Sequence, residues 1–266
     1  MSLAVETRAL TRRFGDVLAV DRLDLAIPEG EAFGLLGPNG AGKTTAIKML
    51  TTLLPPTEGH ARVAGHDIIR DAPAVRRAIG YVPQVLSADG SLTGRQNLEI
   101  FAKLYDIPRA QREERISDAL DFMGLGEAAD RSAKTYSGGM VRRLEIAQSI
   151  LHEPQVLFLD EPTVGLDPVA RAAVWEHIRR LRAEHGMTVI LTTHYMEEAD
   201  LLCERVAIMA KGRIAALGTP AELKASVAKP GATLDDVFAH YTGNSLESGG
   251  DFRDAARARR TARRLG

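Results

Sequence analysis

The chain has 266 residues, 45% of them hydrophobic, which is enough for one large core or two unequal lobes. Its formal net charge of -1 gives no overall electrostatic attraction to nucleic acid. The single cysteine, Cys203, excludes an internal disulfide and indicates a reducing cytoplasm, and no apolar stretch approaches the roughly 20 residues that span a bilayer.

The N-terminal region predicts a small antiparallel sheet. Leu23, Leu25 and Ile27 alternate with polar neighbours, and Gly15-Asp16 is typical of a hairpin turn. The apolar run over residues 32–36 then predicts a further strand.

A glycine-rich loop with a lysine and two hydroxyls follows this strand. It consists of Gly37, Pro38, Asn39, Gly40, Ala41, Gly42, Lys43, Thr44 and Thr45. Its glycines let backbone N–H groups turn inward, Lys43 reaches the β- and γ-phosphates of a nucleotide, and the Thr44 hydroxyl can ligate Mg²⁺. A helix that begins near Lys43 directs its positive dipole end at the same anion. The strand before and the helix after favour this phosphate site over a chance glycine turn.

The next segments alternate in type. Helical spacing continues to Pro55-Pro56, and residues 61–69 show a strand-like pattern. From about residue 91 to residue 149 the pattern is helical throughout, with Gly124 as a helix C-cap. We interpret residues 86–150 as an inserted helical subdomain.

Strands and helices alternate again in the C-terminal half. Residues 156–159 and 187–192 predict strands, separated by a helix that Asp167 caps, Pro168 opens and Gly186 follows. This alternation predicts a parallel sheet. A strand pair over residues 206–217 and a capping box beginning at Thr219 come next.

Two adjacent carboxylates, Asp160 and Glu161, end the strand over residues 156–159. Parallel sheets present their chemistry at this end of a strand. We expect Asp160 to bind Mg²⁺ and Glu161, which points the other way, to orient or deprotonate the water that attacks the γ-phosphate. The alternative is a solvated strand end.

The tripeptide Ser137-Gly138-Gly139 opens a helix, so its N–H groups and the Ser137 hydroxyl form a second anion site. Alone it would be an ordinary helix cap. A chain that binds one nucleotide then has a spare phosphate site.

Together these motifs resemble the nucleotide-binding subunit of ABC transporters over roughly residues 3–225. The motifs in family order are the loop 37–45, Gln84 after Gly80-Tyr81-Val82-Pro83, Tyr136-Ser137-Gly138-Gly139-Met140, Asp160-Glu161, Gly165-Leu166-Asp167 and Thr192-Thr193-His194. The resemblance implies an α/β fold: a P-loop NTPase core with a parallel sheet, an N-terminal antiparallel β subdomain and an inserted α-helical subdomain.

The resemblance also implies a head-to-tail dimer around two MgATP. Ser137, Gly138 and Gly139 of one subunit would close over the γ-phosphate bound by Lys43 of the other. Asp167 would belong to the nucleotide site as well. A group supplied by a partner is worth about 10³ to 10⁵ in rate in other phosphoryl-transfer enzymes, so hydrolysis should depend on association.

Further roles follow from the same resemblance. Gln84 would sense Mg²⁺ and the attacking water, and His194 would contact the γ-phosphate; with Lys43 and Glu161 they form the expected catalytic set. Phe14 would stack on adenine, with a plain core phenylalanine as the alternative.

The motif over residues 136–140 is the signature of the family, and it carries Tyr136 and Met140 where leucine and glutamine are usual. Similar variants occur among exporters of the daunorubicin-resistance type. Residues 92–98 and 233–238 are weaker signals for that subgroup. We expect the ATPase domain over residues 1–228, a helical extension over 229–241 and a disordered basic tail over 242–266. The arginines of the tail could touch anionic lipid, but a solvated tail is favoured.

The expected function is an ATPase subunit at the cytoplasmic face of the membrane that drives a separate integral membrane subunit to export a substrate. A groove near Gln84 would receive a helix of that partner. No nucleic-acid partner is expected, although a non-transport relative acting on DNA or ribosomes is the alternative. A switch that holds ATP without useful turnover is a second alternative. Drug, lipid, sodium and polysaccharide all stay open as substrates.

Overall fold

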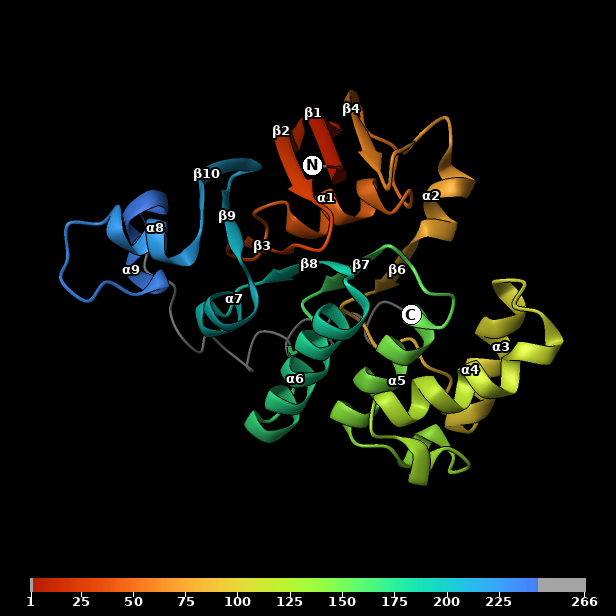
Figure 1. The fold of residues 1–266 in the computed structure, drawn as a ribbon. Helices are drawn as coiled ribbons and strands as arrows, with labels where there is room; N and C mark the ends of the chain where they lie inside the picture. Colours follow the sequence, from red (N-terminus) through yellow and green to blue (C-terminus); the bar gives the residue numbers. More distant parts are fainter. Residues whose placement is uncertain (1, 244–266) are drawn as a thin grey trace, which may run out of the picture.

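The structure is a computed structural model that describes residues 2–243, and its chain folds into two β-sheets and a set of helices (Figure 1). The first sheet is antiparallel, with the order β2-β1-β4-β5. Its strands are β1 (Leu3–Phe14), β2 (Val17–Pro28), β4 (Glu58–Val63) and β5 (His66–Asp67). The antiparallel sheet predicted for the N-terminal region is confirmed, as is the hairpin turn at Gly15, which has φ +53°.

The strand-like pattern over residues 61–69 is found in the structure as two strands and not as one continuous segment. β4 ends at Val63, and the chain turns at Ala64 and Gly65, both with positive φ, before β5 pairs back onto β4. Such a turn needs left-handed backbone, which glycine adopts without steric cost. The two strands flank so short a turn that their patterns merge in the sequence.

The second sheet carries the predicted parallel strands, in the order β10-β9-β3-β8-β7-β6. The strands are β3 (Ala32–Leu36), β6 (Ile79–Val82), β7 (Val156–Asp160), β8 (Thr188–Thr193), β9 (Arg205–Ala210) and β10 (Arg213–Gly218). β3 lies between β8 and β9 and is parallel to both, while β10 pairs antiparallel with β9. The parallel sheet is therefore confirmed.

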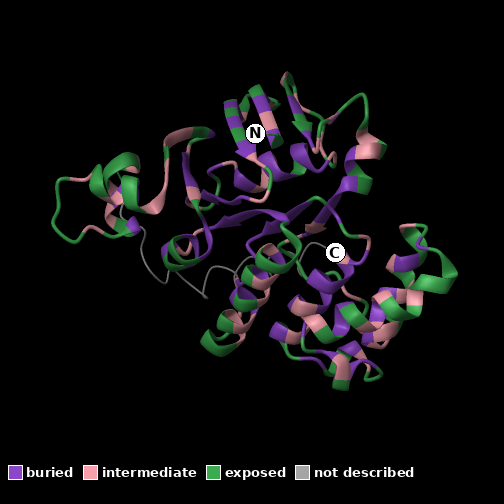
Figure 2. Cartoon of the chain, in the orientation of Figure 1, coloured by how far each residue is buried: buried purple, intermediate pink, exposed green. Residues whose placement is uncertain are grey.

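Both faces of this second sheet are buried along its central strands β3, β8 and β7 (Figure 2). In β8, Val189 and Leu191 face a core that includes residues of α5 (Gly138–Ile150) and α6 (Pro168–His185), whereas Ile190 faces a core shared with α1 (Lys43–Leu50) and the antiparallel sheet. Side chains alternate along a strand, so burial on both sides requires a continuous apolar run. This middle layer places the carboxyl ends of β3, β7 and β8 at one edge.

Helices that pack directly on strands of the two sheets include α1 (Lys43–Leu50), α2 (Ala72–Ala78), α6 (Pro168–His185) and α7 (Met196–Leu202). The prediction for α6 is confirmed in detail. The Asp167 side chain accepts a hydrogen bond from the Ala170 N–H, Pro168 is the first helical residue, and Gly186 follows the helix with φ +60°.

The segment between β6 and β7 contains α3 (Gly94–Leu104), α4 (Arg109–Phe122) and α5 (Gly138–Ile150). The expectation of a helical pattern throughout this segment is wrong. Between α4 and α5 the chain forms turns and two single 3₁₀ turns, starting at Gly124, whose φ of +62° ends the helical path. Figure 1 shows these helices gathered beside α6, away from the antiparallel sheet.

The described chain ends with α8 (Pro220–Ala225) and α9 (Leu234–Thr242), each opened by a capping box. The helical extension expected over residues 229–241 is helical only from Leu234, because Thr233 caps the helix there, and α9 ends one residue later than expected, at Thr242. From residue 244 onward the expected tail, with its arginines, lies outside the described residues. Within residues 2–243 no helix is both long enough and apolar enough to traverse a bilayer.

Candidate active site

The phosphate loop joins β3 to α1 and lies at the carboxyl edge of the parallel sheet. Gly40 and Gly42 have φ values of +81° and +104°, in the region that favours glycine. A Cβ at Gly42 would collide with the Ala19 carbonyl oxygen, and one at Gly37 would collide with that of Met209. The loop therefore needs glycine both for its turn and for its close packing on neighbouring backbone.

Lys43 lies inside this loop and is 4% exposed. Its ammonium donates hydrogen bonds to the carbonyl oxygens of Gly37 (2.7 Å) and Pro38 (3.2 Å). It also forms an ion pair with Glu161, with Nζ 3.3 Å from Oε1. A buried cation is thus held at the start of α1, where the helix dipole adds to its attraction for an anion.

Asp160 and Thr44 meet beside the loop. The Thr44 hydroxyl donates to Asp160 Oδ1 at 3.0 Å, and the Thr192 hydroxyl donates to the same oxygen at 2.6 Å. Asp160 is 1% exposed. A carboxylate and a hydroxyl are the hard oxygen ligands that Mg²⁺ prefers, so this pair fits the predicted metal. Sequence analysis assigned Thr192 only a place in the Thr192-Thr193-His194 motif and no role beside Asp160, because this contact crosses from β8 to β7.

Glu161 departs from the predicted strand geometry. β7 ends at Asp160, and Glu161 has φ +51°, a left-handed conformation that is unusual for a side-chain-bearing residue. Its backbone N–H donates to the Thr192 hydroxyl at 3.0 Å. This bend takes Glu161 out of the sheet and toward the phosphate loop.

The Glu161 carboxylate gathers three of the predicted side chains. Besides Lys43, it receives a hydrogen bond from Gln84 Nε2 at 3.2 Å and lies 3.3 Å from His194 Nδ1. Burial alone would raise the pKa of Glu161, but the hydrogen bond from His194 and the charge of Lys43 outweigh it and lower the pKa. The structure therefore places all four expected catalytic residues together, around an ionised carboxylate.

A surface hollow lies beside the phosphate loop, and Phe14, at the end of β1, lines it. The Phe14 side chain is 44% exposed. The alternative of a core phenylalanine is wrong. The Arg12 guanidinium lies 4.5 Å from the ring centroid. The hollow, which the loop residues, Gln84 and Glu161 also line, has a volume of about 530 Å³, within the size range of small-molecule sites.

Ser137, Gly138 and Gly139 do not line that hollow. The Ser137 hydroxyl accepts from the Met140 N–H at 3.3 Å and so caps α5. A Cβ at Gly139 would lie 2.7 Å from Ala170 Cβ, so this turn packs against the start of α6. Asp167, also outside the hollow, caps that same helix. The chain thus carries two separate helix N-termini of anion-binding type.

Glu198 on α7 is a buried residue that sequence analysis missed. Its Oε1 accepts hydrogen bonds from Thr163 Oγ1 and Trp175 Nε1, each at 2.8 Å. Burial raises the pKa of its carboxyl group. Trp175 is 8% exposed and uses its indole N–H in this bond. A glutamate on a short helix carries no sequence signal for burial.

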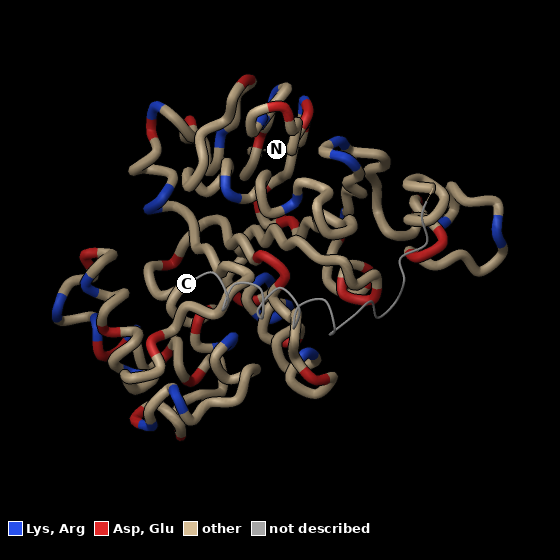
Figure 3. The backbone as a smooth tube through the Cα atoms, turned by 180° about the vertical axis from the view of Figure 1, so that it is seen from behind, with Lys and Arg blue, Asp and Glu red and all other residues tan. Residues whose placement is uncertain are grey.

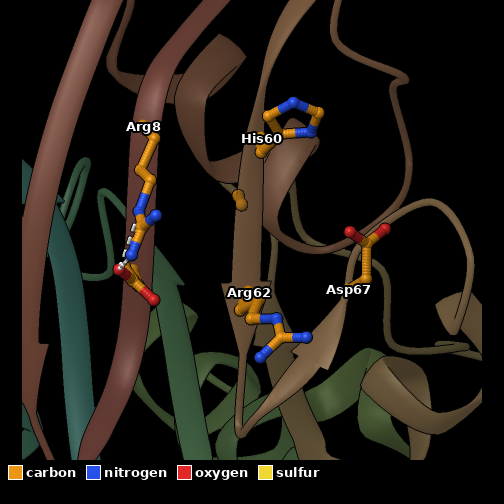
Figure 4. Close-up of a pocket in the computed structure, with 6 residues that line it drawn as sticks. Arg8, His60, Arg62 and Asp67 are labelled. Atoms are coloured by element: carbon orange, nitrogen blue, oxygen red, sulfur yellow. Dashed lines mark hydrogen bonds and ion pairs between the residues drawn. The ribbon is translucent and has the colours of Figure 1, made fainter.

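A second hollow lies on the outer face of the antiparallel sheet, lined by Arg8, His60, Arg62 and Asp67 (Figure 4). The Arg8 and Asp67 charges are already engaged locally. Arg8 pairs with Glu6 at 2.6 Å, and Asp67 accepts the N–H groups of Arg70 and Ile69, which lowers its pKa. In contrast to the phosphate loop, this hollow lacks a buried charged group facing it.

Comparison with known proteins agrees with the geometry. Residues 20–164 match the ABC transporter family. The chain is 50% identical over 224 residues to the daunorubicin/doxorubicin resistance ATP-binding protein DrrA of Streptomyces peucetius, covering 84% of this chain and 68% of that protein. It is 44% identical over 250 residues to the Nod factor export ATP-binding protein I of Sinorhizobium fredii, covering 92% and 70% of the two chains.

Solved structures give the same result. An ATP-binding subunit of an ABC transporter matches with a TM-score of 0.80 at 28% identity, covering 90% of this chain and 99% of that one. A dimeric ATP-binding cassette bound to ADP and Pi matches with a TM-score of 0.72 at 26% identity, covering 81% and 98%. The chain therefore belongs to the ABC transporter family, as an ATP-binding subunit of the kind that hydrolyses ATP to power transport.

Proposed function

We propose that the chain hydrolyses MgATP at the phosphate loop within a head-to-tail dimer and powers export through a separate membrane subunit. The main observation in support of hydrolysis at this site is that Lys43, Gln84 and His194 all contact Glu161. These side chains come from three different segments of the chain, and their meeting point adjoins the Thr44–Asp160 pair. A nucleoside triphosphate is the ligand whose charge and size suit this arrangement.

Each residue receives a role from its contacts. The Lys43 ammonium would exchange its carbonyl partners for phosphate oxygens, and Phe14 would stack on the adenine ring. Thr44, Asp160 and Gln84 would hold Mg²⁺, which neutralises charge on the phosphates when bound. The ionised Glu161 would orient the attacking water and accept its proton, with His194 fixing the carboxylate and contacting the γ-phosphate.

The separation of the two helix N-termini supports the dimer. Ser137 and Gly138 are exposed, as is Asp167, and all three lie outside the hollow of their own chain. A second copy in opposite orientation would bring its Ser137 turn to the phosphate held by Lys43. The exposed side chain of Val169, 80% accessible at the start of α6, would be covered in the same contact.

A groove between the antiparallel sheet side and the helices supports a membrane partner, although Gln84 does not line it. Leu53, Tyr81 and Leu104 give it apolar walls, Arg76 and Arg77 lie beside them, and Leu104 is 70% exposed. We assign this groove to a cytoplasmic helix of the membrane subunit, which places the chain at the cytoplasmic face of the membrane. Export follows from the likeness to proteins named for drug resistance and Nod factor export, and the exported substrate would be drug-like.

The nucleic-acid alternative is less well supported. Figure 3 shows Lys and Arg interspersed with Asp and Glu along the described backbone, especially among α3, α4 and α5. Nucleic-acid binding of this kind usually needs basic residues gathered on one face. The alternative of a non-hydrolysing switch conflicts with Glu161 and His194 being in contact.

The test measures phosphate release per chain at rising protein concentration with MgATP. We expect the rate per chain to rise and then saturate, because each site needs its partner's turn. A constant rate from a chain that sedimentation shows to be monomeric would overturn the dimer.

The membrane partner is tested by copurification of the tagged chain from its native membranes. Leu104→Asp should abolish capture of the membrane subunit. The matched control is Ile69→Asp, which alters a residue 56% exposed on the antiparallel side of the molecule and should leave capture unchanged. Equal capture by both variants would contradict the groove assignment.

A further inference from the structure

Helix α5 buries two charged side chains, Arg142 and Glu145, in the helical region. Arg142 is 2% exposed and is among the largest fully buried side chains, and Glu145 is 3% exposed. Arg142 Nη1 lies 3.0 Å from Glu145 Oε2, one turn farther along the helix. Burying such a pair costs solvation free energy, so its other hydrogen bonds indicate what it contributes.

Those bonds go to the loop that carries Gln84. Arg142 donates to the carbonyl oxygens of Pro83 (2.7 Å, from Nη1) and Gln84 (2.9 Å, from Nη2). Glu145 Oε1 accepts from the Ser87 backbone N–H and, at 3.1 Å, from the Ser87 hydroxyl. The two side chains thus hold both ends of the segment 83–87, while Val85 between them is 77% exposed.

The same helix begins at the Ser137 turn, and the Gln84 side chain contacts Glu161. A rigid helix therefore joins one anion-binding turn to the loop that reaches the catalytic carboxylate of the same chain. We propose that the Arg142–Glu145 pair is a positioning device that fixes Gln84 relative to the Ser137 turn, so that nucleotide held by the partner at Ser137 adjusts Gln84 and Glu161. This inference rests on the head-to-tail dimer proposed above.

The neighbouring Arg143 provides the contrast. Its guanidinium also donates to backbone carbonyls, those of Met123 (2.9 Å) and Gly124 (3.4 Å), but these lie at the end of α4. Arg143 thus holds α5 to another helix and does not touch the Gln84 loop through these bonds. Of these two adjacent arginines, Arg143 therefore serves helix packing, whereas Arg142 holds the loop that carries Gln84.

The test compares the double variant Arg142→Met, Glu145→Leu with Arg143→Met in the full-length chain. Replacing both members of a buried ion pair by apolar residues of similar volume often leaves a fold intact, whereas removing one member leaves a buried unpaired charge. Circular dichroism and the unfolding midpoint report the fold. The single variant Arg142→Lys keeps the charge but lacks the planar fork that reaches two carbonyls.

Turnover and ATP affinity are measured for each variant. In the double variant we expect kcat to fall about 10- to 100-fold, the usual effect of a misplaced catalytic group, with the KM for ATP changed less than about threefold. Arg142→Lys should recover part of kcat. Arg143→Met should lower the unfolding midpoint, but it should not lower kcat selectively while the KM for ATP stays nearly unchanged.

A spin label at Val85→Cys follows the loop directly. The label should be selective, because Cys203 is buried and burial raises the pKa of its thiol. We expect MgATP to restrict the label in the otherwise native chain but not in the double variant. A folded double variant with native kcat and a native label response would overturn the inference. Absence of MgATP-dependent dimerisation in the native chain would instead overturn the proposed function.

Discussion

The N-termini of α1 and α5 differ in their surroundings although both are of anion-binding type. At α1, the loop surrounds a buried lysine; Asp160 and Glu161 contact its residues Thr44 and Lys43, and Gln84 donates a hydrogen bond to Glu161. At α5, the exposed Ser137 hydroxyl caps its own helix. The first has the groups needed to bind and hydrolyse a triphosphate, whereas the second offers donors alone. This difference supports the proposal that the α5 end completes a site on a second copy of the chain.

Glu161→Gln should have the largest effect, because it removes the base while keeping the size of the side chain. We expect kcat to fall about 10³-fold with ATP affinity retained, within the range known for loss of general-base catalysis. Phosphate release and nucleotide binding are measured together. The variant should accumulate as an ATP-bound dimer in gel filtration, and normal turnover would remove Glu161 from the mechanism.

Lys43→Ala tests the α1 end itself. Loss of a charged hydrogen-bond donor to phosphate should weaken ATP binding about 10- to 100-fold, measured by equilibrium titration. Lys48→Ala is the matched control, since Lys48 is exposed on the same helix. Unchanged ATP affinity in Lys43→Ala would refute the assignment of this loop to the phosphates.

Asp160→Asn tests the metal assignment. The Mg²⁺ concentration that gives half-maximal hydrolysis should rise at least about tenfold, since a neutral amide replaces a carboxylate ligand. Binding of ATP in the presence of EDTA serves as the control and should stay near the native value. An unchanged Mg²⁺ requirement would exclude Asp160 as the ligand.

Ser137→Ala tests the α5 end. We expect kcat to fall about tenfold, the effect of one lost hydrogen bond to a charged group, while ATP binding to the isolated monomer is unchanged. Thr93→Ala is the control, because Thr93 caps α3 in the same region through a capping box. Both variants lose a helix cap, so a similar loss of activity in both would mean that Ser137 only stabilises α5.

Phe14→Ala should have the smallest effect. Loss of stacking on adenine should weaken ATP binding about fivefold and affect GTP less. Val17 lies opposite Phe14 across the hairpin and is 65% exposed, so Val17→Ala is the matched control. Equal affinities of the two variants would remove Phe14 from the nucleotide site.

The features of the fold that sequence reasoning predicted in detail are local ones. The caps at Asp167 and Thr219 and the glycine after α6 depend on contacts within a few residues, and all are found in the structure. The errors also have local causes. The turn at Ala64 and Gly65 was hidden within a strand-like pattern, and the 3₁₀ turns between α4 and α5 were hidden within a helical one.

The candidate site divides in the same way. Sequence order and the family resemblance identified Lys43, Gln84, Glu161 and His194, but not that Glu161 leaves its strand in a left-handed conformation to contact the other three. Glu198 and the Arg142–Glu145 pair gave no signal, because charged residues on amphipathic helices usually face solvent.

By itself, the sequence determined the phosphate loop, the second anion-binding turn and the alternation of strands and helices, since each depends on residue type and short spacing. Only the tertiary structure decided which of these motifs share a site. It placed β3 between β8 and β9, brought Gln84 to Glu161, and kept the Ser137 turn out of the hollow. The physical reason is that hydrogen bonds between residues far apart in the chain exist only once the sheet and its cores have fixed the backbone.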